Sequence, residues 1–201
     1  MRVVGPSDAH FVPLQGISPW LQTAVVATED AGFWGHSGFE PTEIKVAVLE
    51  NLRLGGGRGG STITQQLAKN LFLSGERTAT RKLQEALLAW RLEEELPKQR
   101  LLELYLNIAE WGPGLYGARD AAEHYFGRSP ATLQPEEAAF LASLLPSPVR
   151  FHGYYHHGGL TENRQERVRE ILDTMLRLGR MTPDEHQRAT AGPVGLAGCP
   201  W

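Results

Sequence analysis

The sequence predicts an all-α protein, and three observations support this class. Apolar residues recur at the three- and four-residue spacing of a buried helix face over most of the chain. Serine, threonine and proline, which begin helices, stand in front of these segments. Alternating strand patterns are scarce, with Val3-Val4 and His10 to Val12 as weak candidates. With 41% hydrophobic and 21% charged residues among 201, the chain can bury a sizeable core, which excludes a disordered protein.

The first half of the chain contains three predicted helices. Ser18 and Pro19 predict the cap and first position of the first helix. Thr42 is the predicted cap of a second helix, and the glycine-rich run at 55–60 predicts a loop. Ser61 is the predicted cap of the third helix.

The second half is punctuated by proline and glycine. Thr78 or Thr80 opens a long helix, which ends at about Leu96 because Pro97 cannot continue it. Further helices are expected at about 98–109, 117–126, 135–145 and 161–180, and residues 192–201 are expected to form a loose tail.

Charge and composition exclude several classes of protein. The net charge of −3 disfavours a general nucleic-acid binder. A single cysteine, Cys199, excludes a disulfide framework and a cysteine-rich zinc site. The longest apolar stretch, around Ala138 to Leu145, is far shorter than the ~20 residues that cross a bilayer. The chain is therefore expected to lie on a membrane or to be held there, if it acts at one.

Glu85 stands on the predicted long helix among apolar neighbours. These are Leu88, Ala89 and Leu92 on its own face, and Leu83, Leu87 and Trp90 on the other side. We therefore expect a helix that is buried nearly all round. Either Glu85 pairs with Arg81 or Lys82 and serves the structure alone, or it is a carboxylate lining a cleft.

Glu29 and Asp30 form a second acidic pair where the first helix ends. Phe33 and Trp34 follow in a glycine-flanked turn, and His36 lies seven residues after Glu29. One reading is a helix end with solvated charges. The alternative is a general base with aromatic walls beside it.

The stretch 60–66 places five hydrogen-bonding side chains at a helix start. They belong to Ser61, Thr62, Thr64, Gln65 and Gln66. Free backbone N–H groups at such a start favour an anion, and Gly60 lets a ligand approach closely. The alternative is that Ser61 is only a cap.

Lys69, Arg77, Arg81 and Lys82 form a basic group in an acidic protein. A solvated helix face is the ordinary explanation. A phosphate site is the sharper one, since guanidinium groups match phosphate oxygens in a fork.

Five segments in chain order resemble the motifs of glycosyltransferase family 51, the peptidoglycan glycosyltransferases. They are Glu29 to Gly38, Gly60 to Asn70, Arg81 to Glu85, Leu101 to Asn107 with Gly112 to Gly114 and Gly117, and Glu137 to Ala142 with Pro146. The second is the most specific, and the resemblance covers about residues 15–180. It is closest to the monofunctional members, because neither Ser-x-x-Lys nor Lys-Thr-Gly of a penicillin-binding transpeptidase domain occurs.

The resemblance implies a lysozyme-like, two-lobed helical fold with a small membrane-facing jaw lobe. It divides the chain into an N-terminal extension (1–14), a glycosyltransferase domain (15–180, with the jaw lobe at about 40–75) and a C-terminal helix turn with a loose tail (181–201).

The resemblance also implies an activity, the polymerisation of lipid II into glycan strands for the bacterial cell wall. The reaction inverts the anomeric carbon and releases undecaprenyl diphosphate. Glu29 would be the general base and Glu85 the second catalytic glutamate, at the donor site. The implied substrate-binding residues are Asp30, Phe33, His36, Ser61, Thr62, Thr64, Gln65, Gln66, Lys69, Asn70, Arg77 and Arg81, of which Lys69 and Arg77 would hold the departing diphosphate.

No cofactor is expected to be required, and no protein metal site is evident, although Mg²⁺ or Mn²⁺ can assist at the diphosphate. The implied partners are lipid II, the growing glycan strand, the membrane surface through the jaw lobe and cell-wall synthesis proteins, with no nucleic acid. The implied location is the outer, periplasmic face of the bacterial plasma membrane, with the usual membrane anchor not visible in this chain.

One departure from the family pattern bears on the site. Val46 occupies a position that is usually basic, with Lys45 next to it, so one donor-site contact is in question. An interfacial apolar patch is also expected, with packing inside the jaw as its alternative; its residues are Leu49, Leu52, Leu54, Leu71, Phe72 and Leu73. Two rival functions stay open: a lysozyme-like glycan hydrolase and a non-catalytic member that binds lipid II.

Overall fold

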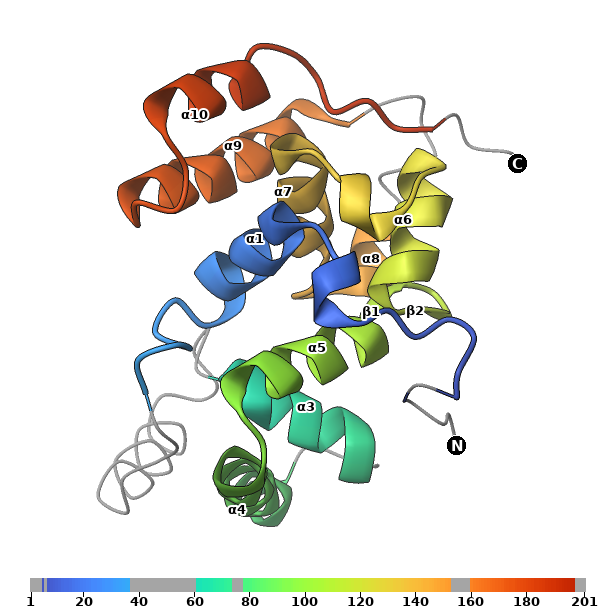
Figure 1. Ribbon diagram of the computed structural model, residues 1–201, viewed down its shortest axis with the longest axis vertical. Coiled ribbons are helices and arrows are strands. Elements are labelled where there is room, and N and C mark those ends of the chain that lie inside the picture. The colour runs from blue at the N-terminus through green and yellow to red at the C-terminus, as the bar shows by residue number, and fades with distance from the viewer. Residues whose placement is uncertain (1–4, 6, 37–60, 74–77, 153–159, 198–201) are drawn as a thin grey trace. The chain divides into compact units, whose positions relative to one another are not determined.

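The computed structural model describes residue 5 and residues 7–36, 61–73, 78–152 and 160–197. These residues are mainly helical, so the predicted all-α class is confirmed (Figure 1). The chain forms two compact units, one of residues 1–28 and 106–201 and the other of residues 29–105. The predicted helix after Thr42 and most of the predicted jaw lobe lie outside the described residues.

The first unit is built around α7 (Pro135–Leu144), which is buried except for its first two residues. Every residue from Glu137 to Leu144 is buried. Helix α9 (Glu162–Arg177) packs on α7 through the apolar stripe Val168, Ile171, Leu172 and Met175, and α10 (Pro183–Thr190) packs on both (Figure 1). The other elements of this unit are η1 (Leu14–Gly16), α1 (Pro19–Glu29, up to Thr28), β1 (Glu110–Gly112), β2 (Leu115–Tyr116), α6 (Ala118–Phe126), η2 (Pro130–Thr132) and α8 (Pro148–His152).

A short antiparallel hairpin departs from the prediction. The segment after residue 109 was expected only to end a helix, but β1 and β2 pair there, with Glu110 opposite Tyr116. Gly114 makes the turn with a φ of 70°, a conformation that favours glycine. Tyr125 donates its hydroxyl to the Trp111 carbonyl at 2.8 Å, which fixes the hairpin on the buried side of α6.

The strand candidate at His10 to Val12 is wrong among the residues that the structure describes. Val12 has the hydrogen bonds of a strand residue, but its partner is a side chain. The Asn107 amide accepts from the Val12 N–H at 2.8 Å and donates to the Val12 carbonyl at 2.9 Å. One amide therefore replaces a neighbouring strand.

The second unit contains α3 (Ile63–Phe72), α4 (Ala79–Glu95) and α5 (Lys98–Ile108, up to Tyr105). Helices α3 and α4 pack against each other. Thr78 caps α4 by accepting from the Arg81 N–H at 3.1 Å, as one of the two predicted starts required. The predicted cap of α3 is off by one residue, because Thr62 rather than Ser61 accepts from the Gln65 N–H, at 3.2 Å.

Within the part of the chain that the structure describes, no helix combines the length and the apolar character needed to cross a membrane.

Candidate active site

Glu29 is held by one amide side chain. It is the last residue of α1 and the first of the second unit. The Gln66 side chain on α3 donates to Glu29 Oε2 at 2.7 Å, and the Tyr105 hydroxyl donates to Gln66 Oε1 at 3.1 Å. Burial, and then the negative charge of Glu29, raise the pKa of Tyr105 well above its ordinary value. Tyr105 therefore keeps its proton and fixes which way the Gln66 amide faces.

Glu85 lies in a polar cluster in which Lys82 bonds to Glu85, Ser61 and Gln65. Only 4% of Glu85 is exposed, and it is paired with Arg81 at 2.5 Å and with Lys82 at 2.9 Å. Lys82 also donates to Ser61 Oγ at 2.8 Å and to Gln65 Oε1 at 3.3 Å. The three protons of one ammonium group thus have three acceptors. Both predicted pairings of Glu85 are present, so two cationic side chains contact its carboxylate.

The first turn of α3 joins these two glutamates. Gln65 and Gln66 are consecutive residues, one bonded to Lys82 beside Glu85 and the other bonded to Glu29. Thr62 caps this turn. The N–H groups at the start of a helix have no partner inside the helix, but here Thr62 accepts from the Gln65 N–H and Asp30 accepts from the Ile63 N–H, which helps to hold this turn in place. The segment at 61–66 therefore carries the link between the two acidic residues.

Asp30, Phe33 and His36 form a compact loop after Glu29. The His36 Nε2 lies 3.1 Å from both carboxylate oxygens of Asp30, and Asp30 accepts from the Ile63 N–H at 3.2 Å. The Phe33 ring is fully buried and lies edge-on to the His36 ring. Both carboxylate oxygens of Asp30 are thus in contact with His36, and one of them also accepts from the backbone at the start of α3.

The remaining predicted residues are placed as follows. Thr64 is buried and donates to Glu93 at 2.6 Å. Lys69 and Asn70 are exposed on α3, and Arg81 is half-buried. Arg77 lies outside the described residues, as do Val46 and the apolar positions at 49, 52 and 54.

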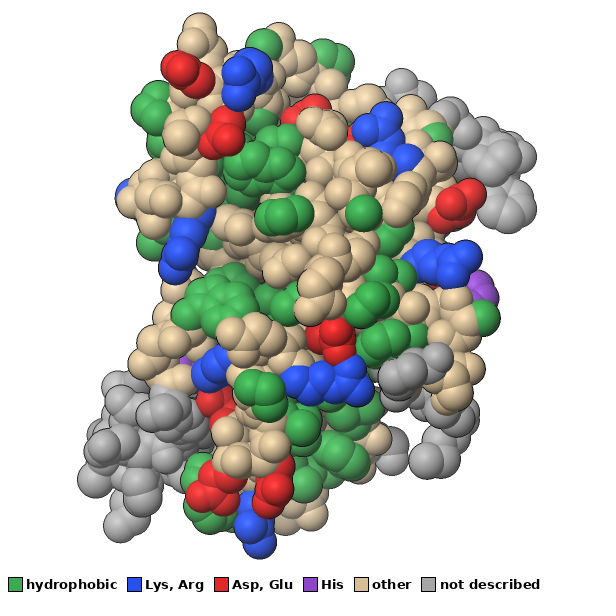
Figure 2. Space-filling view, in the orientation of Figure 1, with side chains coloured by type: hydrophobic (Ala, Val, Ile, Leu, Met, Phe, Trp, Pro, Cys, Tyr) green, Lys and Arg blue, Asp and Glu red, His purple; other side chains and the backbone are tan. Residues whose placement is uncertain are grey.

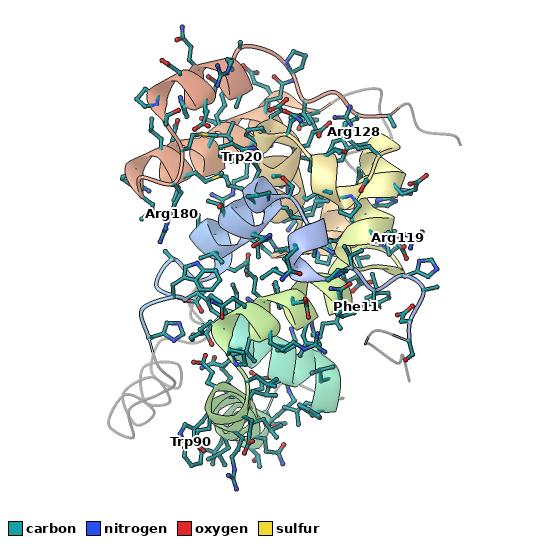
Figure 3. All side chains as sticks on the ribbon, in the orientation of Figure 1. Phe11, Trp20, Trp90, Arg119, Arg128 and Arg180 are labelled. Carbon is teal, nitrogen blue, oxygen red and sulfur yellow. The ribbon has the colours of Figure 1, made fainter. Side chains whose placement is uncertain are left out.

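The outer face of α4 corrects one expectation. Leu83, Leu87 and Trp90 were predicted to be covered, but they are 45%, 48% and 38% exposed. The Trp90 side chain points away from the ribbon of α4 (Figure 3). An apolar stripe at helical spacing cannot by itself tell whether another element covers it. The buried face is the other one, with Glu85, Ala86 and Ala89.

Four residues of this network were missing from the predicted set: Lys82, Tyr105, Glu93, and Lys98, which pairs with Glu93 and contacts His36. Lys82 had been counted as a basic neighbour and Tyr105 as part of the fourth motif. Glu93 lies eight positions after Glu85, about two helix turns on the same side of α4, and that spacing could have indicated it. Nothing in the sequence pattern singled out Lys98.

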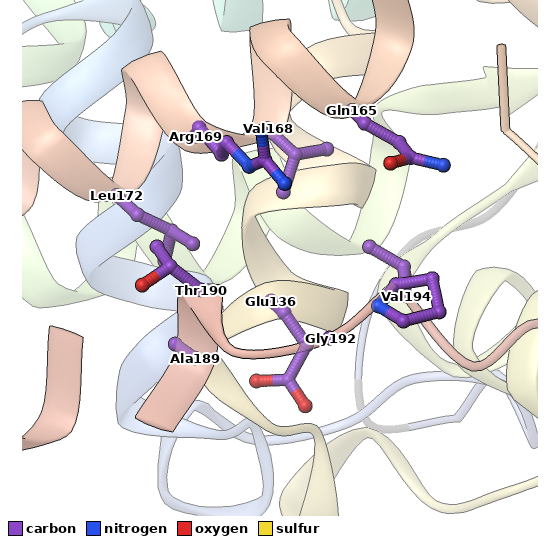
Figure 4. A pocket seen from close by; sticks show the side chains of 10 residues that line it. Glu136, Gln165, Val168, Arg169, Leu172, Ala189, Thr190, Gly192 and Val194 are labelled. Carbon is purple, nitrogen blue, oxygen red and sulfur yellow. The ribbon is translucent and has the colours of Figure 1, made fainter. Parts of the chain in front are cut away.

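No metal centre stands out among the described residues. They contain no group of three His, Cys, Asp or Glu side chains arranged to hold a metal ion. A recess in the first unit is lined by residues from α7, α9, α10 and the chain after α10 (Figure 4). Its lining includes Gln165, Arg169, Leu172 and Thr190, and none of the predicted site residues.

Comparison with known proteins identifies the family. The family model described as Transglycosylase matches residues 2–176. The chain belongs to this transglycosylase family. The resemblance to the peptidoglycan glycosyltransferases is thereby confirmed, and the helical class agrees with their lysozyme-like fold.

Relatives named biosynthetic peptidoglycan transglycosylase are similar over most of this transglycosylase. The one from Alcanivorax borkumensis is 53% identical over 160 residues, which are 79% of this chain and 64% of the relative. The one from Nitrosospira multiformis is 46% identical over 167 residues, 83% of this chain and 71% of the relative.

Longer proteins also match. Penicillin-binding protein 1A from Aquifex aeolicus is 42% identical over 192 residues, which are 95% of this chain but only 26% of that protein. The chain thus spans 26% of the Aquifex protein, 64% of the Alcanivorax protein and 71% of the Nitrosospira protein. A crystal structure of penicillin-binding protein 1A from Haemophilus influenzae matches 81% of this chain and 18% of that one, with 22% identity and a TM-score of 0.44.

Proposed function

We propose that this protein polymerises lipid II into peptidoglycan glycan strands at the periplasmic face of the bacterial plasma membrane. Membership of the transglycosylase family supports the reaction class, and the relatives named biosynthetic peptidoglycan transglycosylase support its direction toward synthesis. The substrates are then lipid II and the growing strand.

In the proposed reaction, Glu29 takes the proton from the 4-hydroxyl of an incoming lipid II sugar. The hydroxyl oxygen forms a bond to the anomeric carbon of the growing strand as the bond from that carbon to undecaprenyl diphosphate breaks. The diphosphate leaves with the bonding electrons, and the anomeric configuration inverts. A positioned base is needed because a sugar hydroxyl is a poor nucleophile, and such a base commonly contributes about 10²–10⁴-fold.

The observation that carries the proposal is the link between the two glutamates. Gln66 orients Glu29, and its neighbour Gln65 bonds to Lys82 beside Glu85. Two acidic groups that approach one sugar from different sides need such a common support, because an inverting reaction sets base and leaving group on opposite faces of the ring.

The charge of the Glu85 cluster suits the leaving group. Arg81 and Lys82 both pair with Glu85, so two cationic side chains lie together beside it. Fixed cations bind a departing diphosphate more tightly as its charge develops, which lowers the barrier. In this proposal Lys69 and Arg77 supply further cations, and Mg²⁺ or Mn²⁺ can assist at the diphosphate.

The deciding experiment uses the purified chain with labelled lipid II in detergent, and sizes the products before and after muramidase digestion. Long, muramidase-sensitive chains support polymerisation. Release of short fragments from purified glycan supports a hydrolase instead, and binding without either product supports a non-catalytic member.

The first variant to test is Glu29→Gln. We expect it to lower the polymerisation rate by about 10²-fold or more while the melting temperature changes little, because the amide keeps the shape but cannot take a proton. Glu94→Gln is the matched control, since that glutamate is 48% exposed in a surface pair with Arg91. A Glu29→Gln protein that polymerises at near the normal rate would remove Glu29 from the role.

A membrane contact through the second unit completes the proposal. The substrate carries a lipid chain, and Leu71 and Phe72 on α3 join the exposed α4 stripe of Leu83, Leu87 and Trp90 as large apolar side chains open to solvent. Figure 2 shows exposed hydrophobic side chains among charged ones on one face of the molecule. Apolar groups beside basic ones are suited to a lipid surface.

A further inference from the structure

The turn between α4 and α5 carries a buried ion pair outside the five motifs. Lys98 Nζ lies 2.5 Å from Glu93 Oε2, and their side chains are 19% and 7% exposed. Taking two charges out of water is costly unless the pair makes further hydrogen bonds. Both residues do so, and every partner that follows belongs to the candidate site.

Lys98 determines the chemical form of His36. Its ammonium group lies 3.2 Å from His36 Nδ1 and 4.6 Å from the centre of the Phe33 ring. An ammonium group can only donate, so Nδ1 must accept and can carry no proton. The imidazole is therefore neutral with its proton on Nε2, from which it donates to Asp30.

Glu93 also binds the first turn of α3. Its Oε1 accepts from the Thr64 hydroxyl at 2.6 Å, while Asp30 accepts from the neighbouring Ile63 N–H at 3.2 Å. The turn that carries Gln66 is thus held at two successive residues. Glu93 bonds directly to Thr64. Lys98 acts on Ile63 indirectly, because it contacts His36, His36 bonds to Asp30, and Asp30 accepts from the Ile63 N–H.

We propose that Lys98 and Glu93 are positioning residues for Glu29. Lys98 keeps His36 in the Nε2–H form, His36 and Asp30 hold the start of α3, and Glu93 holds the next residue. Gln66 then meets Glu29 at a fixed distance. The proposal rests on the proposed function, because the group that is positioned is the proposed base. Among the described residues, the charged groups that face His36 are Asp30, Glu93 and Lys98.

The test compares Lys98→Met with Lys98→Arg in the full chain labelled with ¹⁵N-histidine. The His36 signals are assigned by their loss in His36→Gln. Near neutral pH we expect a proton on Nε2 alone in the wild type. In Lys98→Met we expect a proton on Nδ1 as well, because Glu93 Oε1, 3.9 Å away, becomes the nearest acceptor. Arginine keeps a donor and should restore the wild-type form at least in part.

Polymerisation is measured in parallel. We expect Lys98→Met to lower kcat by about tenfold or more with KM for lipid II within about twofold, since a displaced base affects the chemical step more than binding. Arg91→Met is the matched control, because that cation is 68% exposed on α4. It should leave both the His36 signals and kcat unchanged.

A double variant guards against misfolding. Removing one partner of a buried pair can unfold a protein, whereas removing both charges together is tolerated better. Glu93→Gln with Lys98→Met should therefore keep its melting temperature, show both neutral forms of His36 and lose a similar share of kcat. The proposal is overturned if His36 keeps its proton on Nε2 alone in the folded variants, or if the folded double variant polymerises at the wild-type rate. A wild type that makes no chains would refute the proposed function, while the His36 signals would still decide the role of Lys98.

Discussion

Tyr105 acts on the Glu29 carboxylate through Gln66. An amide can present either its oxygen or its nitrogen, and only the nitrogen can donate to a carboxylate. By donating to Gln66 Oε1, the Tyr105 hydroxyl selects the useful orientation. Its raised pKa keeps that proton in place throughout the physiological pH range.

We predict that Tyr105→Phe lowers kcat for polymerisation by about three- to tenfold, because one neutral hydrogen bond is worth roughly 0.5–1.5 kcal/mol. KM for lipid II should change little. Tyr116→Phe, at a 37% exposed tyrosine of the hairpin, is the control. A full kcat in folded Tyr105→Phe would show that Gln66 needs no such support.

At the scale of elements, α3 and α4 separate what a sequence can predict from what it cannot. The boundaries of α4 follow from local chemistry, with Thr78 before its start and Pro97 after its end, and they were predicted well. The predicted cap of α3 was wrong by one residue, because Ser61 and Thr62 are both good caps and stand side by side. Whether the outer face of α4 is buried depends on which other element packs against it. The prediction that Leu83, Leu87 and Trp90 are buried was therefore wrong. The hairpin at 110–116 failed for a related reason, since five strand residues are too few to show an alternating pattern.

The exposed α4 stripe leads to a prediction about membranes. Replacing Leu87 and Trp90 with serine should weaken co-sedimentation with anionic lipid vesicles by several-fold, because burying a large apolar side chain is worth about 1.5–3 kcal/mol. Val149→Ser is the control, since Val149 is 58% exposed in the first unit. If the Leu87 and Trp90 variant binds the vesicles as well as the wild type does, the α4 stripe is not the membrane contact.

At the scale of the whole molecule, the site depends on residues that the motifs do not contain. The motif residues Glu29, Gln66 and Glu85 could be predicted because their chemistry is unusual for their positions. Glu93 stands in a run of three glutamates and Lys98 follows a proline, so each looks like an ordinary surface charge in sequence. Only the folded chain shows that both are largely buried and that they meet.

Stability should depend on pH through Glu137 in the core helix of the first unit. Burial raises the pKa of Glu137, although the Gln134 N–H and Arg128 act in the opposite direction. The folded state therefore binds this proton more tightly than the unfolded chain does. Stability must fall as the pH rises from the ordinary glutamate value, 4.5, through the raised value, by about 1.4 kcal/mol for each unit between them.

We predict that Glu137→Gln removes this part of the pH dependence, because glutamine can still accept from the Gln134 N–H without carrying a charge. Urea unfolding between about pH 4 and pH 7 should show that the free energy of unfolding of the variant increases relative to that of the wild type as the pH rises. Glu123→Gln, at an exposed position on α6, should follow the wild type. The prediction is wrong if the difference in free energy of unfolding between Glu137→Gln and the wild type stays constant with pH. In that case Arg128 and the helix start fully offset the cost of burying the carboxylate, and its protonation plays no part in folding.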